Sequence, residues 1–243
     1  MTADQPVRPA NIANIVAINQ GARPLTMGEP DAPWLAPSDV AALEANGAIL
    51  VDTRSSAAFG SGHIPGSINV QITTPEFEQR VGWVTPLDVD LVLVLAEDAL
   101  KSSALRALAF LGLDARVKGI LQGGLDAWTA AGNPVATVPQ ISAQGLHSQR
   151  AAGRGPRVLD VREGAEWSAG HVEGAHLQSY RQLEQRLADL PFGRDDAVAV
   201  ICHSGARSST AASLLRRHGF TNVSNVTGGM VAWREAGLPL FNP

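Results

Sequence analysis

The chain has 243 residues, of which 45% are hydrophobic and 17% charged, a balance typical of one or two globular domains and not of a disordered chain. Its formal net charge is −4, and no run of Lys or Arg provides the basic surface that nucleic-acid binding requires. Because no stretch approaches the roughly 18 consecutive apolar residues of a membrane helix, and the N-terminus lacks the apolar core of a signal peptide, we expect a cytoplasmic protein that binds neither nucleic acid nor membrane.

Residues 1–33 have the composition of a tail or linker. They contain five prolines, which discourage continuous regular structure. Within this segment Ile12, Ile15, Val16 and Ile18 recur near helical spacing, so we expect one short helix there.

The rest of the chain contains one pattern twice. The matched residues are Asp52, Arg54, His63, Gly66, Gly123, Gly124 and Trp128 in the first copy and Asp160, Arg162, His171, Gly174, Gly228, Gly229 and Trp233 in the second. Each copy of about 100 residues has the usual size of one domain. We therefore predict a tail over 1–33, one domain over 34–138 and a second domain over 139–243, with the join near Pro139.

Apolar runs of strand length alternate with helical patterns in both copies. The expected strands are 49–52, 91–96, 157–161 and 197–201, and the expected helices are one that ends near Gly112, 208–218 and 229–236. Gly219 follows the second of these helices, where a helix terminator belongs. The alternation predicts an α/β fold in which each domain is a parallel sheet flanked by helices on both faces.

The single cysteine, Cys202, excludes an intramolecular disulfide and a cysteine-based zinc site. The six histidines are scattered without the neighbouring carboxylates or cysteines of a metal motif, so we expect no metal and no other cofactor. Cys202 lies directly after a predicted strand and before a predicted helix, the position at which open parallel sheets bind ligands. Its thiol is either an inert buried group or a nucleophile.

The loop after Cys202 favours the nucleophile. Its residues are His203, Ser204, Gly205, Ala206, Arg207 and Ser208. Gly205 allows a tight curl, Arg207 can hold an anion, and the N-terminus of the following helix presents free N–H groups. Helix N-termini and nearby cations favour the reactive thiolate form of cysteine.

The first copy lacks this loop. Cys202 stands 17 residues before Gly219, and the same count back from Gly112 reaches Leu95. Residues 95–101 include two acidic side chains and no glycine, so we predict that the first domain is catalytically silent. Because that copy retains the matched aspartate, arginine and histidine, we expect structural roles for them in both copies, with the histidines satisfying local backbone groups.

The chain resembles the rhodanese family through four segments. They are Cys202-x-x-Gly205-x-Arg207-Ser208, Asp160-x-Arg162, Gly170-His171-x-x-Gly174-Ala175 and Gly228-Gly229-x-x-x-Trp233. Rhodaneses are sulfurtransferases, so the resemblance implies that Cys202 takes sulfane sulfur from thiosulfate or a low-molecular-weight persulfide and passes it to a thiol or cyanide. It also implies that residues 203–208 bind the donor. Arg162 is either a second cation for the donor or the structural partner of Asp160.

Two other functions are weighed against sulfur transfer. Four residues separate Cys202 from Arg207, whereas related cysteine-dependent phosphatases carry five, so the shorter loop favours sulfur over a phosphoryl group. The alternative that stays open is a non-enzymatic rhodanese-like interaction module with an incidental cysteine. His203 and Ser204 depart from the more basic loops of some thiosulfate-using members, which leaves the preferred donor open.

A narrower resemblance lies in the tail. Residues 8–12 and 19–21 resemble the segment that follows the metallo-β-lactamase domain in fusions of a persulfide dioxygenase with two rhodanese domains. The chain has no His-x-His-x-Asp-His metal motif, so dioxygenase activity is not expected in this chain. Besides a small-molecule donor and acceptor, the implied partner is therefore a separate metallo-β-lactamase-type persulfide dioxygenase.

Overall fold

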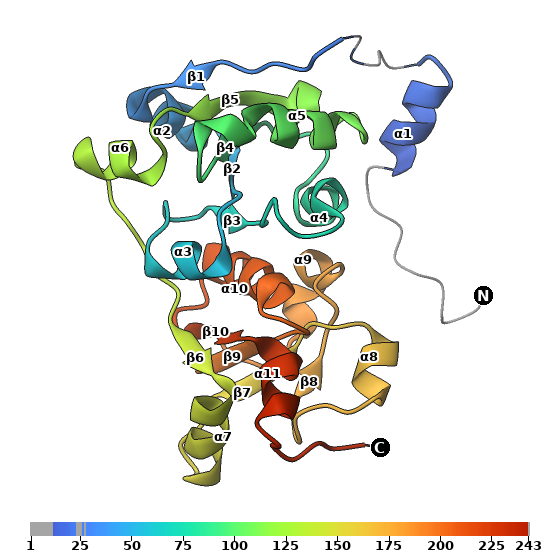
Figure 1. The fold of residues 1–243 in the computed structure, drawn as a ribbon, viewed down its shortest axis with the longest axis vertical. Helices are drawn as coiled ribbons and strands as arrows, with labels where there is room; N and C mark the ends of the chain where they lie inside the picture. The colour runs from blue at the N-terminus through green and yellow to red at the C-terminus, as the bar shows by residue number, and fades with distance from the viewer. Residues whose placement is uncertain (1–11, 23–25, 27, 243) are drawn as a thin grey trace. The chain divides into compact units, whose positions relative to one another are not determined.

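The protein contains two five-stranded sheets with helices between the strands (Figure 1). The computed structural model describes residues 12–22, 26 and 28–242. The strand orders are β1-β5-β4-β2-β3 and β6-β10-β9-β7-β8, which is the same arrangement in both copies. The strand pairs with a described register run parallel, as in β2 with β4 and β7 with β9. The predicted α/β fold is confirmed.

The elements of the first sheet follow a short helix, α1 (Ile12–Asn19), which confirms the helix expected in the tail. They are β1 (Trp34–Leu35), α2 (Pro37–Ala45), β2 (Ile49–Asp52), α3 (Ser56–Ser61), β3 (Ile68–Asn69), α4 (Phe77–Val84), β4 (Leu91–Val94), α5 (Lys101–Ala109), β5 (Val117–Leu121) and α6 (Gly124–Ala130). The dioxygenase-like residues 8–11 lie outside the described residues.

The second sheet repeats this order of elements. They are β6 (Gln140–Ser142), α7 (Ala143–Ala151), β7 (Arg157–Asp160), α8 (Gly164–Ser168), β8 (His176–Leu177), α9 (Leu183–Arg186), β9 (Val198–Ile201), α10 (Ala206–Arg217), β10 (Val223–Thr227) and α11 (Gly229–Glu235). None of the helices in the described part of the chain is long and apolar enough to cross a bilayer.

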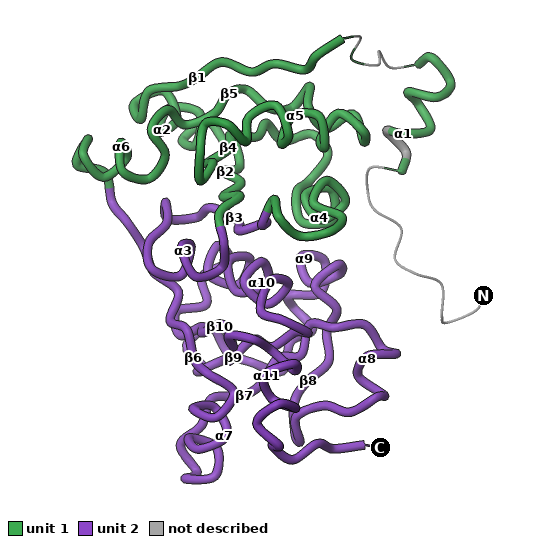
Figure 2. Tube along the Cα trace, viewed as in Figure 1, with its two compact units in different colours: residues 1–54, 72–133 green, residues 55–71, 134–243 purple. Residues whose placement is uncertain are grey.

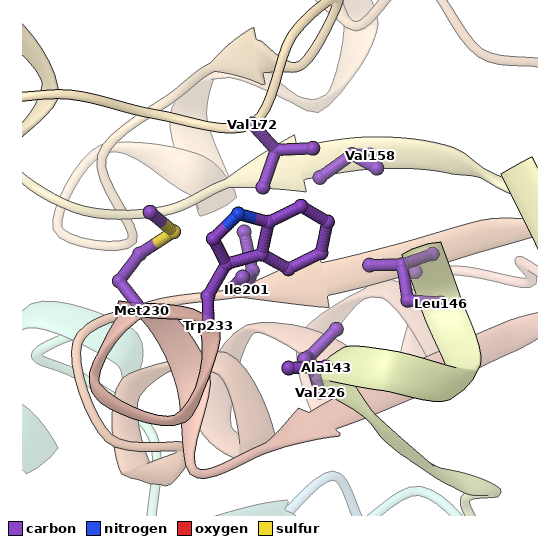
Figure 3. Close-up of a cluster of buried hydrophobic side chains, with 9 residues drawn as sticks. Ala143, Leu146, Val158, Val172, Ile201, Val226, Met230 and Trp233 are labelled. Carbon is purple, nitrogen blue, oxygen red and sulfur yellow. The ribbon is translucent and has the colours of Figure 1, made fainter. Parts of the chain in front are cut away.

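The central strands are buried on both faces, as a parallel sheet covered by helices requires. All four residues of β4 and all four of β9 are buried. On one face of the second sheet, side chains from β7, β9 and β10 pack against α7 and α11, with the Trp233 ring among Val158, Val172, Ile201 and Met230 (Figure 3). Ile201 directly precedes Cys202, so this cluster anchors the strand end from which the cysteine loop departs.

Helix α10 packs against β9 and β10, and it also contacts α3 and β3 from the first sequence copy. The contacts divide the chain into a first unit of residues 1–54 and 72–133 and a second unit of residues 55–71 and 134–243 (Figure 2). Residues 55–71, which carry α3 and β3, therefore belong to the unit that contains Cys202. The compact units do not follow the boundaries of the sequence repeat.

Hydrogen bonds between polar groups connect α10 to residues 55–71. The Ser209 hydroxyl donates to Asn69 Oδ1 at 2.6 Å, and the backbone N–H of Asn69 donates to Ser213 Oγ at 3.0 Å. Arg217 Nη1 donates to the Gly66 carbonyl at 2.7 Å. Asn69, Ser209 and Ser213 are almost completely buried, so these hydrogen bonds satisfy groups that water does not reach.

Candidate active site

Cys202 is the residue directly after β9, and its exposed fraction is 0%. The Gly205 amide donates a hydrogen bond to its Sγ at 3.1 Å, and the Ser208 hydroxyl donates another at 3.3 Å. The sulfur therefore faces two polar donors from its own loop instead of the purely apolar surroundings of an inert core cysteine. Donors in this position suit a sulfur that carries negative charge during a reaction.

The turn of the loop depends on Gly205. Its φ of 102° lies in the region that favours glycine, and the residue caps the N-terminus of α10. The helix begins at Ala206, two residues before the predicted start, so Arg207 and Ser208 lie in its first turn. This places the free N–H groups and the positive end of a 12-residue helix beside the sulfur.

The N-terminus of α11 forms hydrogen bonds with the backbone of the cysteine loop. The Met230 amide donates to the Cys202 carbonyl at 2.8 Å, and the Val231 amide donates to the His203 carbonyl at 3.0 Å. A Cβ on Gly229 would lie 2.7 Å from the His203 carbonyl carbon and would also overlap the Cys202 carbonyl oxygen. Gly229 is thus required for the close approach. The sequence predicted its place in the repeat but not this role at the site.

Arg207 forms an ion pair with Glu166 of α8. Arg207 Nη1 and Nη2 donate to the two carboxylate oxygens of Glu166, each at 2.7 Å, in a bidentate geometry. Burial alone would raise the pKa of Glu166, but the hydrogen bonds and charge of Arg207 outweigh burial and leave that pKa below its ordinary value. Burial likewise opposes the charge of Arg207, yet Glu166 and the Cys202 sulfur raise the pKa of the guanidinium above its ordinary value.

The remaining predicted site residues are divided between the loop surface and the protein interior. His203 and Ser204 are exposed, and Ala206 is partly buried. Arg162 is only 1% exposed, and its guanidinium donates to both Asp160 oxygens and to the carbonyls of Glu166 and Gly170. These contacts favour the structural alternative for Arg162.

The first copy has the same structural contacts around this position as the second, although it has no nucleophile there. Arg54 forms the same bidentate contact with Asp52 that Arg162 forms with Asp160. Leu95 follows β4 as Cys202 follows β9, and a Cβ on Gly124 would lie 3.4 Å from the Leu95 carbonyl oxygen. Leu95 therefore occupies the position of Cys202, as the count along the sequence predicted.

The two matched histidines have structural contacts. His63 stacks on Phe59 with ring centroids 3.8 Å apart, and His171 stacks on Trp167 at 3.4 Å. In each pair the histidine Nδ1 lies within hydrogen-bond distance of the aromatic residue's carbonyl oxygen, at 2.9 and 3.1 Å. The prediction that these histidines satisfy local backbone groups is confirmed. Among the described residues no group of three or more His, Cys, Asp or Glu could hold a metal ion.

Comparison with known proteins agrees with the repeat. The family described as Rhodanese-like domain matches residues 36–131 and again residues 142–236. A sulfurtransferase of Allochromatium vinosum is 32% identical over 106 residues, which are 44% of this chain and 97% of that protein. Thiosulfate sulfurtransferase 16 of the Arabidopsis thaliana chloroplast is 39% identical over 97 residues, covering 35% of this chain and 79% of its own.

Among solved structures, a rhodanese-related protein of Thermoplasma volcanium is 32% identical. The match covers 43% of this chain and 99% of that chain, with a TM-score of 0.39.

Proposed function

Because the chain belongs to the rhodanese-like domain family, we propose that it is a sulfurtransferase that carries sulfane sulfur as a persulfide on Cys202. The proposal rests on the surroundings of the Cys202 sulfur, which accepts hydrogen bonds from Gly205 and Ser208 at the N-terminus of α10. These groups would stabilise an anionic sulfur without any metal or cofactor. The two relatives named as sulfurtransferases support the same activity.

The reaction has two displacement steps. The Cys202 thiolate attacks the outer sulfur of the donor, a new S–S bond forms, and the donor's S–S bond breaks. Sulfite leaves with the bonding electron pair if the donor is thiosulfate, and a thiolate leaves if the donor is a persulfide such as glutathione persulfide. In the second step a thiol or cyanide attacks the outer sulfur of the Cys202 persulfide, and the Cys202 thiolate is the leaving group.

The burial of Cys202 adds a requirement for access. A sulfur with no exposed surface cannot be attacked in this conformation, so the donor reaches it only when part of the loop moves. His203 and Ser204 are the exposed members of the loop and do not contribute to the core. We propose that the His203 side chain and Ser204 form the movable part of the site, because the His203 carbonyl is hydrogen-bonded to the Val231 amide.

The test is intact mass after incubation with thiosulfate and, separately, with glutathione persulfide. We expect the wild type to gain the mass of one sulfur atom and to lose it on addition of cyanide. Because Cys202 is the only cysteine, such an adduct identifies the site, and Cys202→Ser is the matched control. The 0% exposure of Cys202 favours one competing function, the interaction module with an incidental thiol. The absence of an adduct with both donors would count against sulfur transfer and favour that alternative.

The proposed partner is a separate metallo-β-lactamase-type persulfide dioxygenase that exchanges sulfur with this protein. It is supported by the likeness of tail residues 19–21 and 8–12 to the linker of dioxygenase fusions. The proposal predicts sulfur transfer between Cys202 and such an enzyme when both are purified, and no detectable transfer would reject it.

A further inference from the structure

The two arginines considered as cations for the donor, Arg207 and Arg162, are already paired with carboxylates. Arg207 binds both oxygens of Glu166, and Arg162 binds both oxygens of Asp160. The N-terminus of α10, beside the Cys202 sulfur, still offers an anion a partial positive charge of roughly half a unit. The loop thus offers much less positive charge than its arginine content suggests.

Glu166 is held in place for this pairing. It occupies the third position of α8, where its Oε2 accepts the Glu163 amide at 3.3 Å in a reciprocal capping box. The same oxygen accepts Arg207 Nη1, so one contact fixes the carboxylate to its helix and the other fixes Arg207 to the carboxylate. The side chains of Glu166 and Arg207 are 32% and 16% exposed, which limits screening by salt.

Comparison of the two sequence copies shows that the fold does not require this ion pair. The position of Glu166, one residue before the aromatic residue that stacks on histidine, is occupied by Ala58 in the first copy. Residues 95–101, which replace the cysteine loop there, contain no arginine. The Asp–Arg pairs, in contrast, occur in both copies. The Glu166–Arg207 pair therefore occurs in the copy that has the cysteine loop and is not needed to form the sheet.

We infer that Glu166 determines the class of sulfur donor, and this inference rests on the proposed sulfurtransferase function. By neutralising Arg207 it disfavours thiosulfate, a dianion whose charge is adjacent to the transferred sulfur and must approach an anionic thiolate. It favours alkyl persulfides, whose sulfane sulfur can arrive as an uncharged S–S–H group and whose leaving group is a single thiolate. Glu166 acts through Arg207 and is a positioning residue.

The experiment compares two donors in three proteins. Glu166→Gln keeps the size and capping geometry of the side chain but frees the charge of Arg207. Asp196→Asn is the matched control, because it also removes one carboxylate but lies at the opposite end of β9, beside Arg157. For each protein, kcat/KM is measured with thiosulfate and with glutathione persulfide, and the melting temperature reports folding.

We expect the wild type and Asp196→Asn to prefer glutathione persulfide. In Glu166→Gln the ratio of thiosulfate to persulfide kcat/KM should rise by about fivefold or more. A wild-type preference for thiosulfate would overturn the inference, as would an unchanged ratio, including one in which both rates fall together.

A binding measurement keeps this test separate from that of the proposed function. Thiosulfate affinity is measured by calorimetry in Cys202→Ser with and without Glu166→Gln, so no sulfur transfer is needed. We expect the second substitution to tighten thiosulfate binding by about fivefold. Equal affinities would overturn the role of Glu166 even if Cys202 proves to carry sulfur. Failure of the wild type to form a persulfide would instead reject the sulfurtransferase function.

Discussion

Cys202 and Leu95 occupy the same place in two copies of one fold, directly after a buried strand. The chemical difference between the copies therefore lies in a few side chains around that place. Gly205 ends the cysteine loop, Arg207 and Ser208 lie in the first turn of α10, and Glu166 reaches Arg207 from α8. The Asp–Arg pairs and the stacked histidines occur in both copies, so they belong to the scaffold.

Because Glu166 ionises, we expect the free energy of unfolding to depend on pH in the acid range. Its pKa in the folded protein lies below the ordinary value of 4.5, so its pairing with Arg207 stabilises the native state above that value and the stabilisation is lost as the pH falls through the folded pKa. We expect the wild type to exceed Glu166→Gln in free energy of unfolding by about 1 kcal/mol at pH 7. Urea titrations should show this gap closing below pH 4.5. A gap that is independent of pH would contradict the pairing.

At the scale of elements, the junction of β9, α10 and α11 forms the site. The carbonyls of Cys202 and His203 accept amides from α11, while the Gly205 amide points at the cysteine sulfur. The alignment of donors on the sulfur therefore depends on how closely α11 approaches the loop. That approach is possible because Gly229 has no side chain.

Gly229→Ala should disturb this junction, and Gly124→Ala is its matched control. Both glycines have positive φ, 53° and 57°, so the backbone strain of about 1 kcal/mol is common to both substitutions. Only the Gly229 Cβ would overlap the cysteine loop, whereas the Gly124 Cβ meets Leu95 O at 3.4 Å. We expect Gly229→Ala to slow persulfide formation by at least about tenfold, and Gly124→Ala to leave it within about twofold. Equal rates in the two variants, measured by quenched mass spectrometry, would contradict the role of Gly229.

At the scale of the whole molecule, the second compact unit includes residues 55–71 of the first sequence copy. Those residues supply the hydrogen-bond partners of Ser209 and Ser213 on α10. A polar helix face of this kind is stable in the interior only with its partners present. The cysteine loop thus leads into α10, whose buried polar face pairs with residues 55–71 of the first sequence copy.

Separating the repeats should therefore destabilise the second one. We expect a fragment of residues 139–243 to melt several degrees below the full chain, because α10 loses Asn69 and its neighbours. A double-mutant cycle of Asn69→Ala and Ser209→Ala in the full chain serves as the control and should give a coupling of about 1 kcal/mol. A fragment that melts with the full chain, together with no coupling, would show that residues 55–71 are dispensable.

Much of the fold and the centre of the site could be predicted from local patterns. Buried strands show as short apolar runs, helices as a period near 3.6, and turns as glycines, so the alternation of elements and the place of Cys202 follow from neighbouring residues. The sequence pattern starts α10 two residues too late because Gly205 ends the loop by adopting a positive φ, which residue identity allows but does not require. Comparing the copies position by position, Glu166 against Ala58, is the signal that could have revealed Glu166.

Local residue patterns are enough to predict the α/β class, the absence of a nucleophile at Leu95 and the strand-loop-helix setting of Cys202, and matching those patterns along the chain reveals the twofold repeat. The folded structure is needed to see that Glu166 pairs with Arg207 across 41 positions and that Asn69 pairs with Ser209 across 140. Such contacts join single polar side chains from different elements and leave no periodic signature. They form only when packing brings those elements together and removes the water that would otherwise satisfy their polar groups.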